Sequence, residues 1–224
     1  QLYLIREGIS YRALYGYNAI GIYRTDEEAA EHMANNSYIP EAGDLKYEDV
    51  NGDGRLDYRD KQVLGNTIPK YTYGINLGLT YKNLNLDVVT MGIAGAHAYT
   101  ANAWTQPLGI SGGTITTRWR DAWTPENPDA SLPRIRINDT WNRYESSFWV
   151  TDISFFKIKN IQLSYNLPSR WLQRMNVDGL SIYLNVQNLP AFVTDDYEGF
   201  DPERSTFDSG ASLYPTPVMT SIGV

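Results

Sequence analysis

Alternation of apolar and polar side chains is the clearest pattern along this chain. In residues 71–81 every odd position is apolar or aromatic, and every even position is small or polar. A period of two over a stretch of this length predicts a β-strand with one apolar and one polar face. After a short turn at Lys82 and Asn83 the alternation resumes in residues 84–88. These two stretches therefore predict a β-hairpin.

Three further stretches alternate in the same way, namely residues 161–167, 180–186 and 218–224. Upstream of the first, Phe156 and Ile158 are apolar on the opposite phase, so we expect a β-bulge near Lys159 and Asn160. The chain thus carries about five predicted strands.

Two short helical segments interrupt this pattern. Residues 169–178 predict a polar helical turn closed by Gly179, and residues 27–33 predict a short surface helix with Thr25 or Asp26 as its N-cap.

The connections between the predicted strands are very unequal. Two are short, but residues 95–152 and 194–217 form long connections, and a long segment precedes Tyr71. Compact soluble domains rarely carry such loops, whereas outer-membrane β-barrels combine short periplasmic turns with long extracellular loops. The polar face is mostly neutral, which suits a polar lumen better than the charged outer face of a soluble β-sandwich. The pattern favours an all-β fold of transmembrane β-barrel strands.

About five strands cannot close a membrane barrel, because the smallest barrels have eight. An open sheet edge in lipid would leave backbone groups unpaired. We therefore expect the chain, which starts in mid-pattern at Gln1, to be a fragment of a larger barrel.

The amino-acid composition excludes several classes of function. A net charge of −7 argues against nucleic-acid binding, and the absence of cysteine excludes disulfides and thiolate metal sites. The two histidines, His32 and His97, are far apart, which disfavours a histidine-rich zinc site. Seventeen tyrosines and six tryptophans in a polar chain suit a membrane interface or a carbohydrate-binding surface. No apolar run is long enough for a transmembrane helix.

An acidic loop at residues 49–60 has the oxygen spacing of an EF-hand calcium loop. Side-chain oxygens come from Asp49, Asn51, Asp53, Asp57 and Asp60, Arg55 would offer its backbone carbonyl, and Gly54 occupies the sharp-turn position. Asp60 replaces the usual bidentate glutamate, which predicts a weaker structural Ca²⁺ site. The alternative is an Asx-rich turn without an ion.

Aromatic side chains crowd one long connection, which contains Trp104, Trp119, Trp123, Trp141 and Trp149. Trp104, Trp119, Trp141 and Trp149 are candidates for stacking on a ligand or packing against a partner protein. The alternative is that they bury the connection against itself. Asp87, on the polar face of its predicted strand, is a further candidate ligand contact, with hydrogen bonding to its neighbours as the alternative.

An ordered series of motifs resembles the C-terminal portion of SusC-like TonB-dependent transporters of Bacteroidetes outer membranes. The resemblance covers nearly the whole chain. The matching segments are residues 6–8, 14–17, 21–23, 43–47, 49–60, 73–77, 123–128, 159–168, 187–189 and 199–203.

The resemblance implies the C-terminal strands of a 22-stranded barrel in the outer membrane of a Gram-negative cell. Residues 1–70 would be an extracellular excursion, residues 71–224 about five strands with long outer loops, and the N-terminal plug would lie outside this chain. It also implies a SusD-like surface lipoprotein as partner, the TonB complex as energy source, and oligosaccharides or peptides as cargo. No covalent chemistry is implied.

Two other functions stay open on the residues alone. One is a secreted, calcium-stabilised β-domain that binds glycans through aromatic side chains. The other is a carboxylate-dependent glycoside hydrolase using two members of the acidic run at residues 195–208.

Overall fold

The computed structural model describes residues 2–101, 106–108, 115–175, 177–195, 197, 201–203 and 216–224, leaving aside the side chains of residues 174 and 175. Two compact units emerge. Unit 1 contains the described residues of Gln1–Ile68 and His97–Thr151, and unit 2 contains those of Pro69–Ala96, Asp152–Thr206 and Leu213–Val224. The connection predicted between residues 95 and 152 therefore folds with the N-terminal segment.

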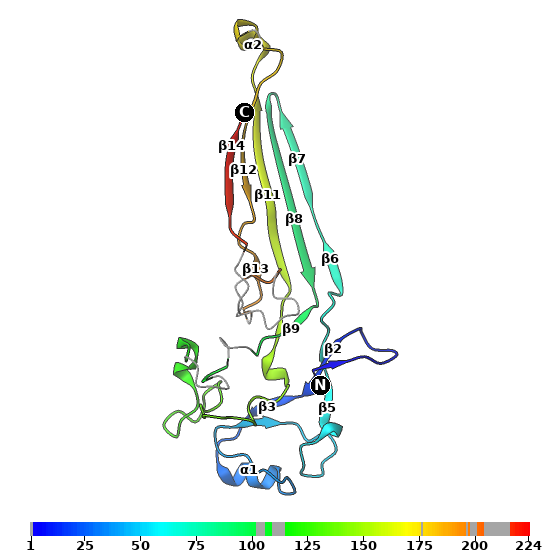
Figure 1. Cartoon of the computed structure of the whole chain (residues 1–224), viewed down its shortest axis with the longest axis vertical. Helices are drawn as coiled ribbons and strands as arrows, with labels where there is room; N and C mark the ends of the chain where they lie inside the picture. Colours follow the sequence, from blue (N-terminus) through cyan, green and yellow to red (C-terminus); the bar gives the residue numbers. More distant parts are fainter. Residues whose placement is uncertain are drawn as a thin grey trace. The chain divides into compact units, whose positions relative to one another are not determined.

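Unit 2 is an antiparallel sheet with the order β14-β12-β11-β8, in which β6 and β7 both pair with β8 and the short β13 pairs with β11 (Figure 1). The strands are β6 (Tyr71–Tyr73), β7 (Asn76–Tyr81), β8 (Leu84–Ala94), β11 (Phe155–Asn166), β12 (Ser181–Gln187), β13 (Phe192–Val193) and β14 (Met219–Gly223). The predicted strands are confirmed.

Strands β6 and β7 behave as one strand with a brief interruption. Tyr73 pairs with Gly92 and Asn76 with Val89, so the register against β8 does not change. Between them, the Thr90 hydroxyl accepts from the Ile75 N–H and donates to the Ile75 carbonyl, at 3.0 and 2.9 Å. The Thr90 side chain thus supplies hydrogen bonds at the interruption between the two strands.

The predicted β-bulge is also confirmed. The register of β11 against β8 shifts between Ile158 and Asn160, which leaves Lys159 as the extra residue. A one-residue shift moves every later side chain to the opposite face. The bulge therefore brings Phe156 and Ile158 onto the same face as Ile161, although their phases differ in sequence.

Two helices match their predictions. α1 (Asp26–His32) begins after Thr25, whose side chain accepts the Glu28 N–H. α2 (Ser169–Met175) connects β11 to β12. No described helix is long and apolar enough to cross a membrane.

Unit 1 contains short strands and three 3₁₀ helices that the alternation pattern does not predict. The elements are β1 (Tyr3–Leu4), β2 (Ala13–Tyr17), β3 (Ala19–Ile22), β4 (Leu45–Tyr47), β5 (Lys61–Gly65), β9 (His97–Tyr99), β10 (Val150–Asp152), η1 (Tyr58–Asp60), η2 (Thr117–Asp121) and η3 (Ser147–Trp149). β1, β2 and β5 form one sheet, β3 pairs with β4, and β9 pairs with β10.

Aromatic side chains build the core of unit 1. One cluster of buried residues contains Tyr17, Met33, Leu45, Tyr47 and Trp141. The Trp141 indole donates to the Leu45 carbonyl, and the Tyr47 hydroxyl donates to the Trp141 carbonyl, both at 2.8 Å. These bonds satisfy the polar ends of two buried rings, so residues far apart in sequence are fixed together.

Candidate functional site

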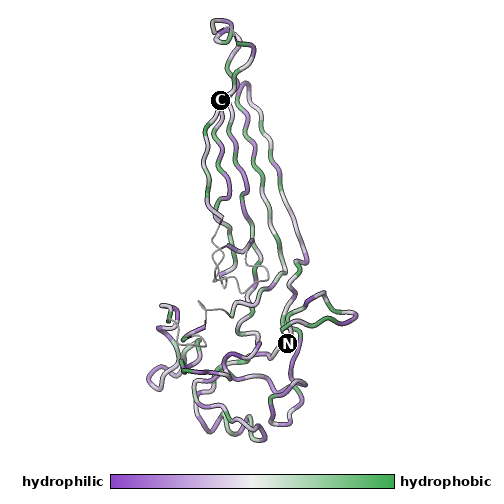
Figure 2. Tube along the Cα trace, in the orientation of Figure 1, coloured by the Kyte–Doolittle hydropathy of each residue, from purple (hydrophilic) through white to green (hydrophobic). Residues whose placement is uncertain are grey.

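One face of the unit 2 sheet is apolar and exposed to the surroundings. The strand register places one aliphatic side chain of each strand side by side, in a row formed by Leu79, Leu86, Leu163, Leu184 and Ile222. Leu79 is 54% exposed and Leu184 41% exposed. Figure 2 shows the same alternation as hydrophobic and hydrophilic positions that follow one another along the strands. An apolar patch of this extent marks a surface that contacts lipid or protein.

Aromatic side chains mark both ends of this apolar face. At one end Tyr81 and Tyr165 lie in the row that also contains Leu84 and Ile182. At the other end Gly92 pairs with Tyr73 on one side and with Phe156 on the other, and Phe156 pairs with Phe192. The stacked rings of Tyr73 and Phe156 have centroids 6.4 Å apart, and those of Phe156 and Phe192 are 6.3 Å apart. The Tyr73 ring occupies the space that a side chain on Gly92 would need. An aliphatic band between two aromatic rows is typical of strands that cross a bilayer.

The opposite face of the same sheet carries mostly neutral polar side chains. Asn185, only 6% exposed, donates to the side-chain oxygens of Asn160 at 2.7 Å and Gln162 at 3.3 Å. Asp87 pairs with Gln162 across the strands and is exposed, so its predicted place on the polar face is confirmed. Its role as a ligand contact stays a prediction.

An ion-pair cluster formed by Lys157, Lys159, Asp201 and Glu203 holds the segment after β13 to strand β11. Lys157 is almost fully buried and lies 3.3 Å from Asp201 and 3.2 Å from Glu203. Lys159, the bulge residue, lies 2.6 Å from Glu203. Asp201 also accepts the N–H groups of Glu203 and Thr216. The four charges compensate one another, which buried charges require.

The acidic loop folds into a compact turn closed by its own hydrogen bonds. The Asp49 carboxylate accepts the N–H groups of Gly52, Asp53 and Gly54, at 2.6–3.3 Å. The fully buried Asp60 accepts the N–H groups of Val50 and Asp57. These contacts are those expected of an Asx-rich turn.

A guanidinium group already neutralises part of the acidic loop. Arg59 lies 2.6 Å from Asp53 and 2.7 Å from Asp57, and its hydrogen bonds lower the pKa of Asp57. Among the residues that the structure describes, no group of three or more acidic or histidine side chains is arranged to hold a metal ion. The oxygens suit a hard cation chemically, but a cation coordinated by Asp53 and Asp57 would have to displace Arg59. Calcium binding therefore stays a prediction.

Comparison with known proteins identifies relatives along most of the chain. It is 29% identical over 92% of its length to TonB-dependent receptor P3, and 28% identical over 93% to TonB-dependent receptor P26, both of Formosa agariphila. It is 24% identical over 79% of its length to TonB-dependent receptor SusC of Bacteroides thetaiotaomicron. The chain is related to the SusC-like TonB-dependent receptors. No protein-family model matches it.

Solved structures agree on the fold of this chain. The RagAB peptide importer in its open-open state superimposes on 98% of the chain with a TM-score of 0.68, at 21% identity. A second structure, of the RagAB peptide transporter, superimposes on 91% with a TM-score of 0.67. The chain spans only about a fifth of the length of its curated relatives.

Three of the tryptophans predicted to contact a ligand lie inside unit 1. Trp119, Trp141 and Trp149 are only 2–3% exposed, and the Trp149 indole donates to the Asn142 carbonyl at 2.9 Å. Burial to this degree favours the alternative that they bury the long connection against itself. Trp104 lies outside the described residues.

Asp44 in unit 1 has a buried carboxylate whose contacts the sequence did not predict. Asp44 is fully buried and accepts from Arg134 at 2.9 Å, Arg136 at 3.0 Å and the Asn142 amide at 3.1 Å. It ties the segment before β4 to residues 134–142. Spacing along the sequence gives no signal of this contact, because its partners are about ninety residues away.

The acidic run considered for glycosidase chemistry is divided between ion-paired, exposed and undescribed positions. Asp201 and Glu203 pair with the lysines of β11. Asp195 is exposed, whereas Asp196, Glu198 and Asp208 lie outside the described residues.

Proposed function

We propose that this chain forms part of the wall and outer loops of a SusC-like importer in the outer membrane of a Gram-negative cell. In this proposal the strands of unit 2 belong to a closed β-barrel of 22 strands, with the apolar face toward lipid and the polar face toward a lumen. Unit 1 lies on the cell exterior. The remaining strands and the plug come from sequence outside these 224 residues.

The two-faced sheet of unit 2 is the observation that carries the proposal. Tyr73 and Tyr81, at the two aromatic ends, are eight residues apart in a continuous register. At ~3.4 Å per residue they are about 27 Å apart along the strand. A strand tilt of ~40° reduces this to roughly 20 Å along the membrane normal, near the apolar height of ~25 Å typical of outer-membrane barrels.

Transport in this proposal follows the logic of a TonB-gated barrel. A SusD-like lipoprotein captures the nutrient at the cell surface, and the TonB complex powers its passage through the lumen. The polar face offers side-chain amides and hydroxyls, together with Asp87, as transient contacts for cargo. No bond in the cargo is broken or made.

The cargo is an oligosaccharide or a peptide. Burial of Trp119, Trp141 and Trp149 weakens the argument that exposed indoles stack on sugar rings. The similar solved structures carry the name peptide importer. These two observations give peptides more support than the sequence alone gave them.

The alternative of a secreted glycan-binding domain has less support. A soluble domain would need to cover the row that contains Leu163 and Leu184, because a large exposed apolar patch promotes aggregation. The curated relatives carry the names of receptors, which agrees with a function other than catalysis.

Paired arginine substitutions on adjacent residues of β11 test the lipid-facing assignment. Leu163→Arg puts a charge on the apolar face one row inside the aromatic end at Tyr165, where the expected cost lies between the ~2–4 kcal/mol of the bilayer midplane and the ~0–1 kcal/mol of the interface. Ser164→Arg puts the same charge on the polar face and is expected to cost little. The measurement is the amount of folded receptor in outer membranes.

We expect Leu163→Arg to reduce folded receptor measurably while Ser164→Arg leaves it near the unsubstituted level. Equal loss for both variants would contradict the membrane assignment. Improved solubility of Leu163→Arg in the aqueous fraction would favour the secreted domain.

A further inference from the structure

The register of β11 places Lys157 on the polar face of the unit 2 sheet. Lys157 alternates along the strand with Phe156 and Ile158, which lie on the apolar face. The ammonium group of Lys159, the bulge residue, meets the same Glu203 carboxylate that Lys157 meets. Two cations of this sheet are therefore directed to its polar side.

Residues 201–203 cover these two cations. The Lys157 side chain is only 3% exposed, and its ammonium nitrogen lies 3.3 Å from the Asp201 carboxylate and 3.2 Å from that of Glu203. Asp201 and Pro202 are themselves buried. The segment therefore lies against the polar face of β11 and does not extend away from the sheet.

Hydrogen bonds of the Asp201 carboxylate fix this position. It accepts the Glu203 N–H at 3.1 Å and the Thr216 N–H at 3.3 Å, so it joins the segment to the chain that returns toward β14. Moving the segment off the sheet would leave Lys157 as a buried charge without its partners, which is unfavourable. Residues 201–203 are thus a fixed part of this face.

A cavity of about 250 Å³ lies beside the ion pairs. Its lining includes the charged Lys157 and Asp201, the partly exposed Thr216, and the apolar Leu189 and Val193. A small molecule can therefore approach Thr216 through this cavity.

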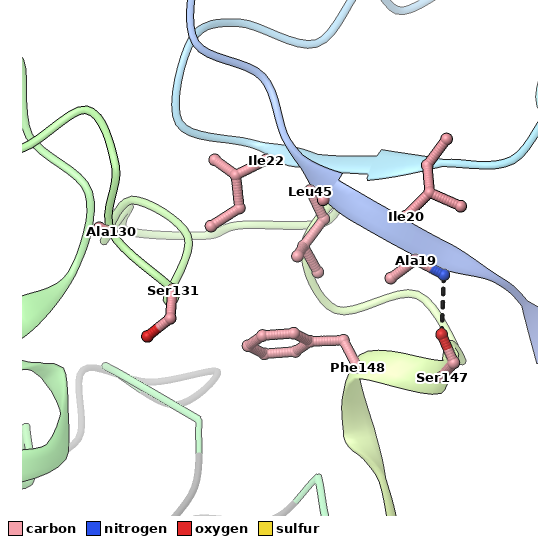
Figure 3. A pocket seen from close by; sticks show the side chains of 9 residues that line it. Ala19, Ile20, Ile22, Leu45, Ala130, Ser131, Ser147 and Phe148 are labelled. Carbon is pink, nitrogen blue, oxygen red and sulfur yellow. Dashed lines mark hydrogen bonds between the residues drawn. The ribbon is translucent and has the colours of Figure 1, made fainter.

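The cavity of about 380 Å³ in unit 1 has a different chemistry. Figure 3 shows Ile22, Leu45 and the Phe148 ring pointing into one space, with Ser131 across from them. The side chains that line it are apolar or carry a hydroxyl group. Charged groups that could act on passing cargo therefore lie beside the polar face of unit 2 and not in this cavity.

We propose that residues 201–203 project into the lumen of the importer, narrow it beside β11 and neutralise the two lysines of its wall. This inference rests on the proposed function, because the polar face is a lumen wall only if the apolar face meets lipid. Cargo then passes a fixed constriction instead of an open wall with two free ammonium groups. The segment limits the width of cargo and removes an attraction for anionic cargo.

Cysteine labelling of the full-length receptor in detergent tests this location. These 224 residues contain no cysteine, and Thr216→Cys keeps the backbone N–H that Asp201 accepts. A small maleimide should label Thr216→Cys, whereas a maleimide with a long polyethylene glycol chain should not, because its coil is too wide for the narrowed lumen. The unsubstituted receptor gives the background labelling.

Substitution of Lys157 should change the labelling by the bulky reagent. Adding Lys157→Met to Thr216→Cys releases the segment and should speed this reaction on the order of tenfold or more. The matched Lys157→Arg keeps the charge and should leave the reaction slow. The amount of folded receptor in outer membranes establishes that each variant folds.

Two control positions separate this inference from the importer proposal. Glu27→Cys, on the exposed side of α1, should react with both reagents, and Asp87→Cys, exposed on the polar face, should exclude the bulky one in any closed barrel. Equally fast bulky labelling of Asp87→Cys and Glu27→Cys would contradict the importer proposal itself. Exclusion at Asp87→Cys, together with an equal bulky labelling rate of Thr216→Cys with and without Lys157→Met, would overturn this inference alone.

Discussion

Buried charges are the residue-scale feature that fixes loop segments of this chain. Lys157 holds Asp201 and Glu203 in unit 2, and Asp44 holds Arg134 and Arg136 in unit 1. Removing one partner of such a pair leaves an uncompensated buried charge and typically costs about 3–5 kcal/mol. Each set of ion pairs therefore holds together two segments that are distant in sequence.

Lys157→Met should release the segment at Asp201 and Glu203 from strand β11. A local loss of about 3 kcal/mol corresponds to amide exchange on the order of 100-fold faster at Glu203. The double variant Lys157→Met with Asp201→Leu removes both buried charges and should recover part of the protection. Hydrogen exchange measured by mass spectrometry reports both the loss and the recovery of protection. Unchanged exchange in Lys157→Met would show that Lys157 does not hold this segment.

The same cluster gives a pH dependence. Burial alone would raise the pKa of both Asp201 and Glu203, but backbone N–H donors at Asp201 and the two lysines at Glu203 outweigh it and hold each pKa below its ordinary value. Because the folded-state pKa values are depressed, the stabilisation is complete above the ordinary values of 3.8 and 4.5 and is lost as the pH falls through the folded values.

We therefore expect protection of the Glu203 amide, corrected for intrinsic exchange rates, to stay constant from about pH 7 to about pH 5 and to fall below about pH 4. Exchange measured over a pH series checks this. A loss of protection already at about pH 6 would mean that another group controls the segment.

The β-bulge in β11 is the decisive feature at the scale of elements. Without the extra residue, Phe156 and Ile158 would face the polar side while Ile161 and Leu163 faced the apolar side. The bulge thus lets one strand of twelve residues keep a single apolar face. It also directs Lys159 toward Glu203.

Deletion of Lys159 should prevent correct assembly of the sheet. It forces either residues 155–158 or residues 160–166 onto the wrong face. The control, Lys159→Asn, keeps the residue count and loses only the ion pair, so most of the protein should still fold. The readout is folded receptor in outer membranes, and normal levels for the deletion would show that the bulge is dispensable.

The acidic loop permits a direct test of the calcium prediction. If the ion binds, Ca²⁺ should raise the thermal midpoint of the chain in detergent, and Asp49→Asn should reduce the shift. Arg59→Gln, which frees Asp53 and Asp57, should strengthen the response. Absence of any shift in all three proteins would leave the loop as a self-contained Asx-rich turn.

The sequence predicted the strands of unit 2 well because each carries its own period-two pattern. It predicted the bulge from a local change of phase. It could not predict the core of unit 1, because Trp141 and its acceptor Leu45 are 96 residues apart and no local periodicity links them. For the same reason the closely spaced tryptophans correctly predicted an aromatic cluster, but their spacing could not show whether the rings were buried or exposed.

At the scale of the whole molecule, the chain combines a core-containing unit with a sheet that has no covered apolar side. Unit 1 buries aromatic clusters, whereas unit 2 exposes the row from Leu79 to Ile222. Such a sheet gains its stability from its surroundings. The proposed importer supplies these surroundings as lipid outside and further strands at the edges.

Purification from outer membranes should therefore recover the chain with a SusD-like lipoprotein and the remaining barrel strands. Mass spectrometry of everything that co-purifies in detergent checks this expectation. A chain found alone in the soluble fraction would contradict the importer proposal.

The spacing of the aromatic rows also has a consequence for where such a protein can reside. A span of roughly 20 Å between them is shorter than the ~30 Å hydrocarbon core of an average bilayer. In a thick bilayer the lipid tails around the sheet would have to compress, at a cost for every ångström of mismatch. In the proposed importer, the positions of Tyr73 and Tyr81 would therefore favour the thin outer membrane over thicker bilayers.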